Sequence, residues 1–135
     1  MKKAKIWVED WEMQCCGDPF KVGDSVSWTI SKWDSVFSEI TPKNIDYYYD
    51  NHASNEEIVY KLECVVSGIE VVYALYKLIE NRNIPVEYRV EPFEGEANGW
   101  TENLDEQYRF CAYLVQLEYE GDIGIEEDTK VMPVW

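Results

Sequence analysis

The sequence predicts a small, mainly β domain: an antiparallel barrel or strongly curved sheet of the SH3-like or OB-like kind, with five or six strands and one short helix near residues 32–40. Three observations predict this fold. Apolar residues recur with period two in several segments, which is typical of half-buried strands. The 135 residues are the usual length of one domain, so we expect a single domain over residues 1–135. Strands do not alternate with helices along the chain, which disfavours a parallel α/β sheet.

Five segments carry the strand pattern. Residues 24–30 and 58–66 alternate apolar with polar side chains, so each predicts a strand with one buried face. Residues 108–119 are apolar on both faces and rich in residues that favour strands, which indicates a central strand covered on both sides. Residues 4–13 and 84–93 supply two further strands.

Residues 69–79 fit two patterns, because their apolar side chains match both the period of a strand and the spacing of a helix. Valine, isoleucine and tyrosine dominate the segment, so we predict a strand. Ser67 and Gly68 then indicate a bulge or bend within one long strand. Residues 81–83 predict the turn into the next strand.

The short helix is predicted from spacing. Trp33, Val36, Phe37 and Ile40 lie at i, i+3, i+4 and i+7, so they would share one helical face. Pro42 follows directly and would end such a helix.

Two polar stretches, residues 41–57 and 94–107, predict long loops, and loops on a small barrel are where binding residues usually lie. Tryptophans on the predicted strands or helix are expected mostly in the core; these are Trp7, Trp11, Trp28 and Trp33. Large rings in the two loops instead mark partner contacts, or fold back to close the end of a barrel. At the end of the last long strand, alternate carboxylates would share one face. The candidate binding residues are Tyr47, Tyr48, Tyr49, His52, Trp100, Glu118 and Glu120.

Acidic residues outnumber basic ones by 27 to 12, which gives a net charge of −15. Residues 91–135 alone hold twelve acids and two bases. This field repels phosphate backbones, so we expect no nucleic-acid binding, and it favours a basic protein partner. Acidic clusters such as Glu9, Asp10 and Glu12 are interpreted as solvated edges. Because no apolar stretch is long enough for a signal peptide or a membrane helix, we expect a cytoplasmic protein without membrane contact.

The four cysteines are predicted to pack rather than react. Cys64 and Cys111 share the phase of apolar neighbours and are expected in the core. Cys15 and Cys16 are adjacent, a spacing that structural zinc sites do not use and that would strain a direct disulfide. Their acidic neighbours would raise the pKa of a thiol rather than lower it. The pair remains a weak metal candidate, and no cofactor is predicted.

A signature runs along the N-terminal part of the chain, carried by Trp11, Met13, Gln14, Cys15, Cys16, Gly17, Pro19, Phe20, Val22, Gly23, Asp24, Val26 and Trp28. This run resembles the opening of an uncharacterised bacterial family of small cytoplasmic proteins, known as a domain of unknown function. The resemblance extends, more weakly, to residues 65–76 and 109–118. It implies a bacterial source and a single domain, and it assigns no catalytic residue.

No motif of the sequence assigns a biochemical activity, and four functions fit it. The first is a non-enzymatic acidic binding module that docks a protein partner. A second is an immunity-like or antitoxin-like inhibitor of a basic protein. A third is a thiol-dependent or metal-dependent enzyme using Cys15 or Cys16, and a fourth is a barrel that holds a small apolar ligand. The balance is against an enzyme, and the sequence leaves the oligomeric state open.

Overall fold

A computed structural model describes residues 2–15, 17–33, 40–50, 60–121 and 124–125. Within these ranges the chain is mainly β with one short helix, as predicted. The elements are β1 (Lys2–Glu9), α1 (Asp10–Cys15), β2 (Ser25–Lys32), β3 (Tyr47–Tyr49), β4 (Tyr60–Ile79), β5 (Arg82–Pro92), β6 (Tyr108–Tyr119) and β7 (Gly124–Ile125).

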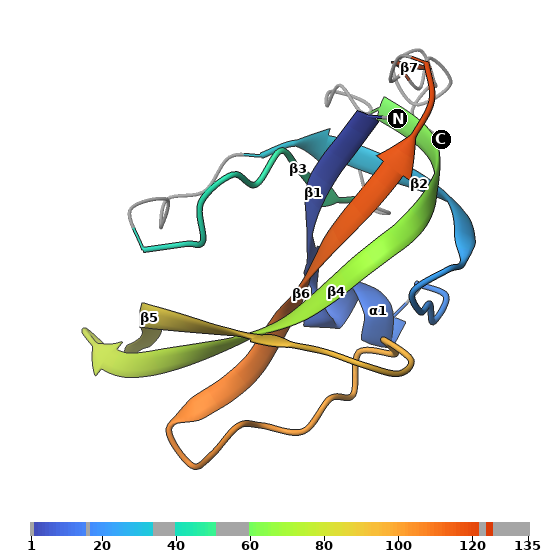
Figure 1. The fold of residues 1–135 in the computed structure, drawn as a ribbon. Coiled ribbons are helices and arrows are strands. Elements are labelled where there is room, and N and C mark those ends of the chain that lie inside the picture. Colours follow the sequence, from blue (N-terminus) through green and yellow to red (C-terminus); the bar gives the residue numbers. More distant parts are fainter. Residues whose placement is uncertain (1, 16, 34–39, 51–59, 122–123, 126–135) are drawn as a thin grey trace.

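The strands form one sheet whose hydrogen bonds run around a closed ring. The order is β2-β3-β1-β6-β4-β5, and β2 also pairs with β4, so β1, β6, β4, β2 and β3 close on themselves. The sheet is mixed rather than purely antiparallel, because β3 runs parallel to β1. Figure 1 shows the end of β4 and the paired β5 leaving the ring as a two-stranded arm.

The long strand β4 makes both the ring and the arm. Its first residues, 60–65, pair with β2, and residues 70–79 pair with β5. The register with β6 shifts between Val66 and Gly68, which confirms the predicted bulge and the strand at 69–79. The turn that follows uses Glu80 and Asn81, both with positive φ, one residue earlier than predicted.

The helix lies at a different place from the predicted one. Residues 34–39, which form most of the predicted helix near 32–40, fall outside the described residues, and Lys32 belongs to β2. Instead, α1 replaces the second half of the strand that residues 4–13 predict. Asp10 and Glu12 lie in its first turn, where carboxylates favour a helix N-terminus, and the Trp11 backbone N–H donates to Asp10 Oδ1 at 2.8 Å.

One of the two predicted loops contains a strand. Residues 47–49 form β3, which pairs with β1 on one side and with β2 on the other. These partners are distant in sequence, so no local pattern marks the pairing. The other loop, 94–107, is confirmed apart from a single bridge between Phe20 and Ala97.

Two apolar clusters hold the sheet together. The larger one fills the inside of the ring, where the Phe20 and Trp28 rings meet edge to face with centroids 4.9 Å apart. The smaller one covers the opposite face of β1, β4 and β6 and centres on Trp7. Strand β6 is therefore buried on both faces, as its sequence predicts. Cys64 and Cys111 are buried as expected, the first in the inner cluster and the second in the outer one.

Gly99 offers a test of how loop 94–107 is fastened to α1. A Cβ at Gly99 would lie 2.8 Å from Met13 Cβ and 3.0 Å from the Gln14 backbone nitrogen, and the φ of Gly99 is +89°. Because both overlap and backbone strain oppose it, Gly99→Ala is expected to lower the free energy of unfolding by about 2–4 kcal/mol. Gly95→Ala is the control, since its φ is +105° but no atom lies within 4 Å of the added Cβ. Urea denaturation that shows equal losses in the two variants would exclude the overlap as a cause.

Candidate functional site

A small pocket lies on the outer side of the ring, where β1 meets α1 and where β2 and β3 end. Its volume is about 240 Å³. Aromatic rings and carboxylates line it, and no lysine or arginine is among the described residues of its lining. We call it the aromatic pocket, and its residues are Trp7, Glu9, Trp11, Glu12, Trp33, Tyr48, Tyr49 and Asp50.

The alternation of strand β3 divides its three tyrosines between two faces. Tyr47 and Tyr49 point into the inner cluster, where the Tyr49 and Trp28 ring centroids are 5.1 Å apart. Tyr48 points the other way and packs against the outer cluster. Both Tyr48 and Tyr49 line the pocket, one from each side of the strand.

Two tryptophans form a corner of the pocket. The Trp7 and Trp33 ring centroids are 5.4 Å apart and their planes are inclined at 49°. The Tyr88 ring packs edge to face against Trp7, with ring centroids 5.7 Å apart. The Trp7 indole Nε1–H donates to Glu9 Oε1 at 2.9 Å, so the ring has a fixed orientation.

The carboxylates of the pocket are engaged within the protein. Glu12 and Asp50 are 2% and 8% exposed, and Ser31 Oγ donates to Asp50 Oδ2 at 3.1 Å. Among the described residues, every buried side-chain nitrogen or oxygen has a hydrogen-bond partner. The burial of Glu12 corrects the prediction that this acidic cluster is a solvated edge. Glu12 is buried because it lies on α1 rather than on the strand that residues 4–13 predict.

Burial and mutual repulsion act on the titratable groups of the pocket. Burial raises the pKa of the Glu9 carboxyl, and the charges of Asp10 and Glu12 raise it further, against the lowering effect of the Trp7 hydrogen bond. Burial also raises the pKa of Tyr49 to about 12, with a contribution from Glu12. Raised pKa values mean that negative charge is held here at a free-energy cost, which a bound cation would relieve.

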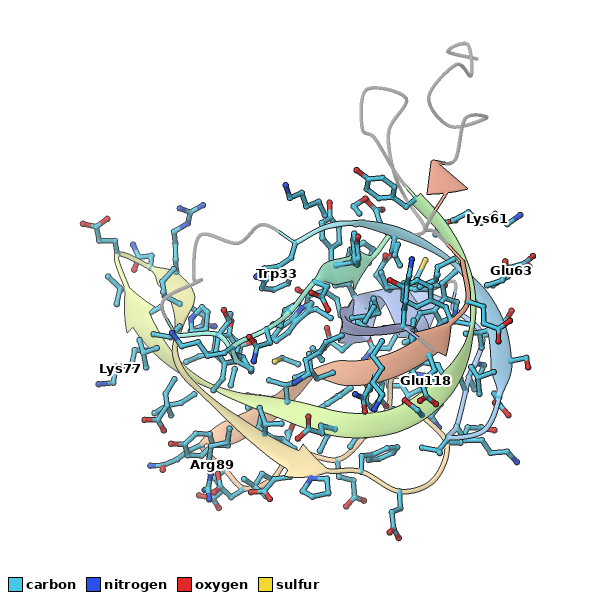
Figure 2. All side chains as sticks on the ribbon, turned by 45° about the horizontal axis from the view of Figure 1, so that its top comes forward. Trp33, Lys61, Glu63, Lys77, Arg89 and Glu118 are labelled. Carbon is cyan, nitrogen blue, oxygen red and sulfur yellow. The ribbon has the colours of Figure 1, made fainter. Side chains whose placement is uncertain are left out.

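A second acidic feature lies on the outer face of β2, β4 and β6. Val65 pairs with both Ser25 and Glu118, so the three strands run side by side at this point. Glu118 and Glu120 therefore share a shallow groove of about 600 Å³ with Glu63. We call this the acidic groove. Figure 2 shows Trp33 apart from Glu63 and Glu118, so the groove and the aromatic pocket are separate surfaces.

The structure therefore places the predicted binding residues on different surfaces. Tyr48 and Tyr49 lie in the aromatic pocket, and Glu118 and Glu120 lie in the acidic groove. Tyr47 packs against Tyr60 with centroids 5.8 Å apart, at the edge of the inner cluster.

The two remaining candidates lie elsewhere. Trp100 is 69% exposed and lines another hollow, with Gln14 and Arg109. His52 falls outside the described residues.

Sequence reasoning missed Trp11 and Trp33, which it placed mostly in the core with Trp7 and Trp28. Trp7 and Trp28 are buried as expected. Trp11 is 50% exposed, because residue 11 lies on a helix rather than on the strand that was predicted. Trp33 is half-buried directly after β2. A signal was present in the acidic residues around Trp11, which are unusual beside a core tryptophan.

The described cysteines offer no reactive thiol. Burial raises the pKa of Cys64 to about 11 and also raises the pKa of Cys111. Cys15 is exposed at the end of α1 and is disulfide-bonded, which corrects the prediction that a disulfide at this cysteine pair is disfavoured. Cys16 is outside the described part of the chain. Within that part, no group of three or more histidine, cysteine or acidic side chains is placed to hold a metal ion.

The fold and these two surfaces define a small, mainly β, acidic protein with one short helix. The chain belongs to DUF6578, a family of unknown function, which matches residues 2–119. This confirms the resemblance to a domain of unknown function. No curated protein and no solved structure matches the chain. No helix in the described residues is long and apolar enough to cross a membrane.

Proposed function

We propose that the protein is a non-enzymatic binding module that docks a basic protein partner through the aromatic pocket. The observation that carries this proposal is the composition of the pocket: the described residues that line it are five aromatic residues and three carboxylates, with no basic side chain among them. A cationic side chain that enters would meet ring faces and negative charge together.

The pocket has the features of an interface anchor point. Tryptophan and tyrosine are enriched among the residues that contribute most to protein association, and they act in desolvated pockets. Trp11 and Trp33 present such rings at the surface, while Trp7 and Tyr49 are held rigidly beneath. A partner side chain would therefore find a site already formed, which reduces the entropy lost on binding.

The charge of the whole chain supports a basic partner. The net charge of −15 attracts cationic proteins at long range and speeds their encounter. The acidic groove adds to this field from a separate surface, and its carboxylates are more exposed to salt screening. Association is therefore expected to slow as ionic strength rises, while the contact at the aromatic pocket is retained.

A lysine-rich peptide of nine residues is a defined probe for this function. We expect it to bind at low salt and to change the tryptophan fluorescence, whereas an acidic peptide of equal length does not. Trp11→Ala is expected to weaken binding about fivefold to thirtyfold, since one cation–π contact contributes about 1–2 kcal/mol. Isothermal titration calorimetry gives the affinities.

Trp100→Ala is the matched control for Trp11→Ala. It removes an even more exposed tryptophan, but one that does not line the aromatic pocket. Equal losses in the two variants would show that general surface hydrophobicity, not the pocket, holds the peptide. Unchanged affinity in Trp11→Ala would exclude the pocket as the docking site.

A further inference from the structure

We propose that the aromatic pocket receives a methylated ammonium group, carried by a lysine side chain of the partner. This inference rests on the proposed function and names the chemical group that the partner inserts. Two features of the pocket favour a methylated ammonium over an unmodified lysine or an arginine: the inclination of the rings and the engagement of the carboxylates. The small volume limits the occupant to the head group of one side chain.

The two rings Trp7 and Trp33 are tilted relative to each other rather than stacked in parallel. Trp7 and Trp33 meet at 49° with centroids 5.4 Å apart, so their faces do not cover each other fully. Tyr48 and Trp11 add rings from β3 and from α1. Rings that line one pocket from several elements suit a rounded cation, because aromatic rings attract the positive charge spread over the methyl groups.

The carboxylates supply charge more readily than they supply hydrogen bonds. Glu9 already accepts from Trp7 at 2.9 Å, and Asp50 accepts from Ser31 at 3.1 Å. A primary ammonium brings three N–H donors and a guanidinium brings five, and each donor that leaves water without an acceptor opposes binding. A trimethylammonium group has no donor. The nearby negative charge attracts it, and the carboxylates keep their hydrogen bonds from Trp7 and Ser31.

The size of the pocket limits what can enter. At about 240 Å³ it lies below the usual range of about 300–1,000 Å³ for sites that enclose a whole small-molecule ligand. The pocket therefore suits the head group of one side chain, and the rest of the partner would lie outside it.

Three probes test the inference: the lysine-rich peptide, the same peptide with its central lysine trimethylated, and the tetramethylammonium ion. We expect the trimethylated peptide to bind at least about tenfold more tightly than the unmodified one, the change that about 1.4 kcal/mol of added ring contact gives. We expect tetramethylammonium to compete with the trimethylated peptide, but to bind more weakly because it lacks the peptide contacts.

The variant Trp33→Leu keeps an apolar side chain and removes one ring face of the corner. We expect it to reduce the preference for the trimethylated peptide to about twofold or less, since that preference depends on the ring faces. Trp11→Leu tests the same property at a half-exposed position, in case Trp33→Leu does not fold. Trp100→Leu is the control and should keep the full preference. Circular dichroism checks that each variant is folded.

The outcomes separate the inference from the proposed function. If the two peptides bind with equal affinity and Trp11→Ala weakens the binding of both, the methylated group is overturned and the basic partner is retained. Tetramethylammonium binding as tightly as the trimethylated peptide would overturn the lysine source and point to a free quaternary amine. Binding of none of the three probes would overturn both proposals. A tenfold preference that survives Trp33→Leu and Trp11→Leu would place the recognition outside the pocket and overturn the inference.

Discussion

Tyr113→Ala is expected to lower the free energy of unfolding by about 3–5 kcal/mol, more than Gly99→Ala or Tyr113→Phe. The Tyr113 side chain is fully buried, and its ring packs against Phe20, Phe93 and Phe110 with centroids between 5.0 and 6.1 Å away. Removing the ring leaves a cavity in the middle of the inner cluster, which the surrounding strands cannot close. Urea denaturation followed by circular dichroism gives the loss directly.

Tyr113→Phe separates the hydroxyl group from the ring. The Gly99 backbone N–H donates to Tyr113 Oη at 3.1 Å, and Thr101 Oγ1 shares a hydrogen bond with it at 2.6 Å. Because Phe leaves the buried Gly99 N–H without its partner, we expect a loss of about 1–3 kcal/mol. Tyr108→Phe on the same strand is the control, since the Tyr108 hydroxyl bonds to Glu87 at an exposed site. A loss in Tyr108→Phe as large as that in Tyr113→Phe would contradict this account.

Tyr113 also connects the core to the aromatic pocket. Its hydroxyl holds Gly99, and the Gly99 carbonyl in turn accepts a hydrogen bond from Gln14 Nε2 at 2.7 Å. Gln14 lies on α1, the helix that carries Trp11 and Glu12 into the pocket. Tyr113→Phe removes the hydrogen bond that fastens loop 94–107 at Gly99. It is therefore expected to weaken peptide binding as well as stability, although Tyr113 does not line the pocket.

Most of the sheet could be predicted from the sequence, because it follows from local alternation. Residues 108–119 match β6 in full, and the bulge at Gly68 was expected. The helix α1 could not be predicted in the same way. Trp11 and Met13 continue the period-two pattern of β1 in the sequence, and only the turn of the chain at Asp10 ends the strand. Pairing of β2 with β4, which closes the ring, joins segments that no local pattern connects.

The candidate site was predicted in part for the same reason. Tyr48 and Tyr49 were expected to bind because they fall in a predicted polar loop, where large rings mark partner contacts. Their partners in the pocket come from α1 and from the ends of β1 and β2, and only the closed ring brings these together. Alternation assigned Trp11 to the core, and net charge assigned Glu12 to the surface, so neither rule could reveal that the two share a pocket.

The affinity of the pocket for a cation is expected to rise with pH above the ordinary carboxyl range. Tetramethylammonium is the suitable probe, since it does not titrate. Burial raises the pKa of Glu9 above its ordinary 4.5 and raises the pKa of Asp10 above 3.8. In the free protein these carboxyls therefore keep their protons to higher pH than usual. A bound cation favours the ionised forms, so binding releases protons and strengthens as pH rises, until the carboxyls of the free protein are also ionised.

The other groups that face Glu9 do not change charge over this range. Burial raises the pKa of Tyr76 to about 12 and also raises the pKa of Tyr88 and Cys111, so these side chains stay neutral at pH 4–8. They come from β4, β5 and β6, which pack against the end of β1. The pH dependence between pH 4.5 and 7 is therefore assigned to the carboxylates of β1 and α1, of which Glu9 and Glu12 line the pocket.

Glu9→Gln isolates the charge of one carboxylate, because the Gln carbonyl can still accept the Trp7 hydrogen bond. We expect tetramethylammonium to bind this variant about tenfold more weakly at pH 7, a loss of about 1.4 kcal/mol, because the cation loses its attraction to one nearby negative charge. The dependence on pH should flatten as well. Glu63→Gln removes the same charge from the acidic groove and should change the affinity less than about twofold, because Glu63 is exposed on a separate surface, where salt screens its charge. Equal effects of the two substitutions would mean that net charge alone attracts the cation, and the aromatic pocket would then have no part in its recognition.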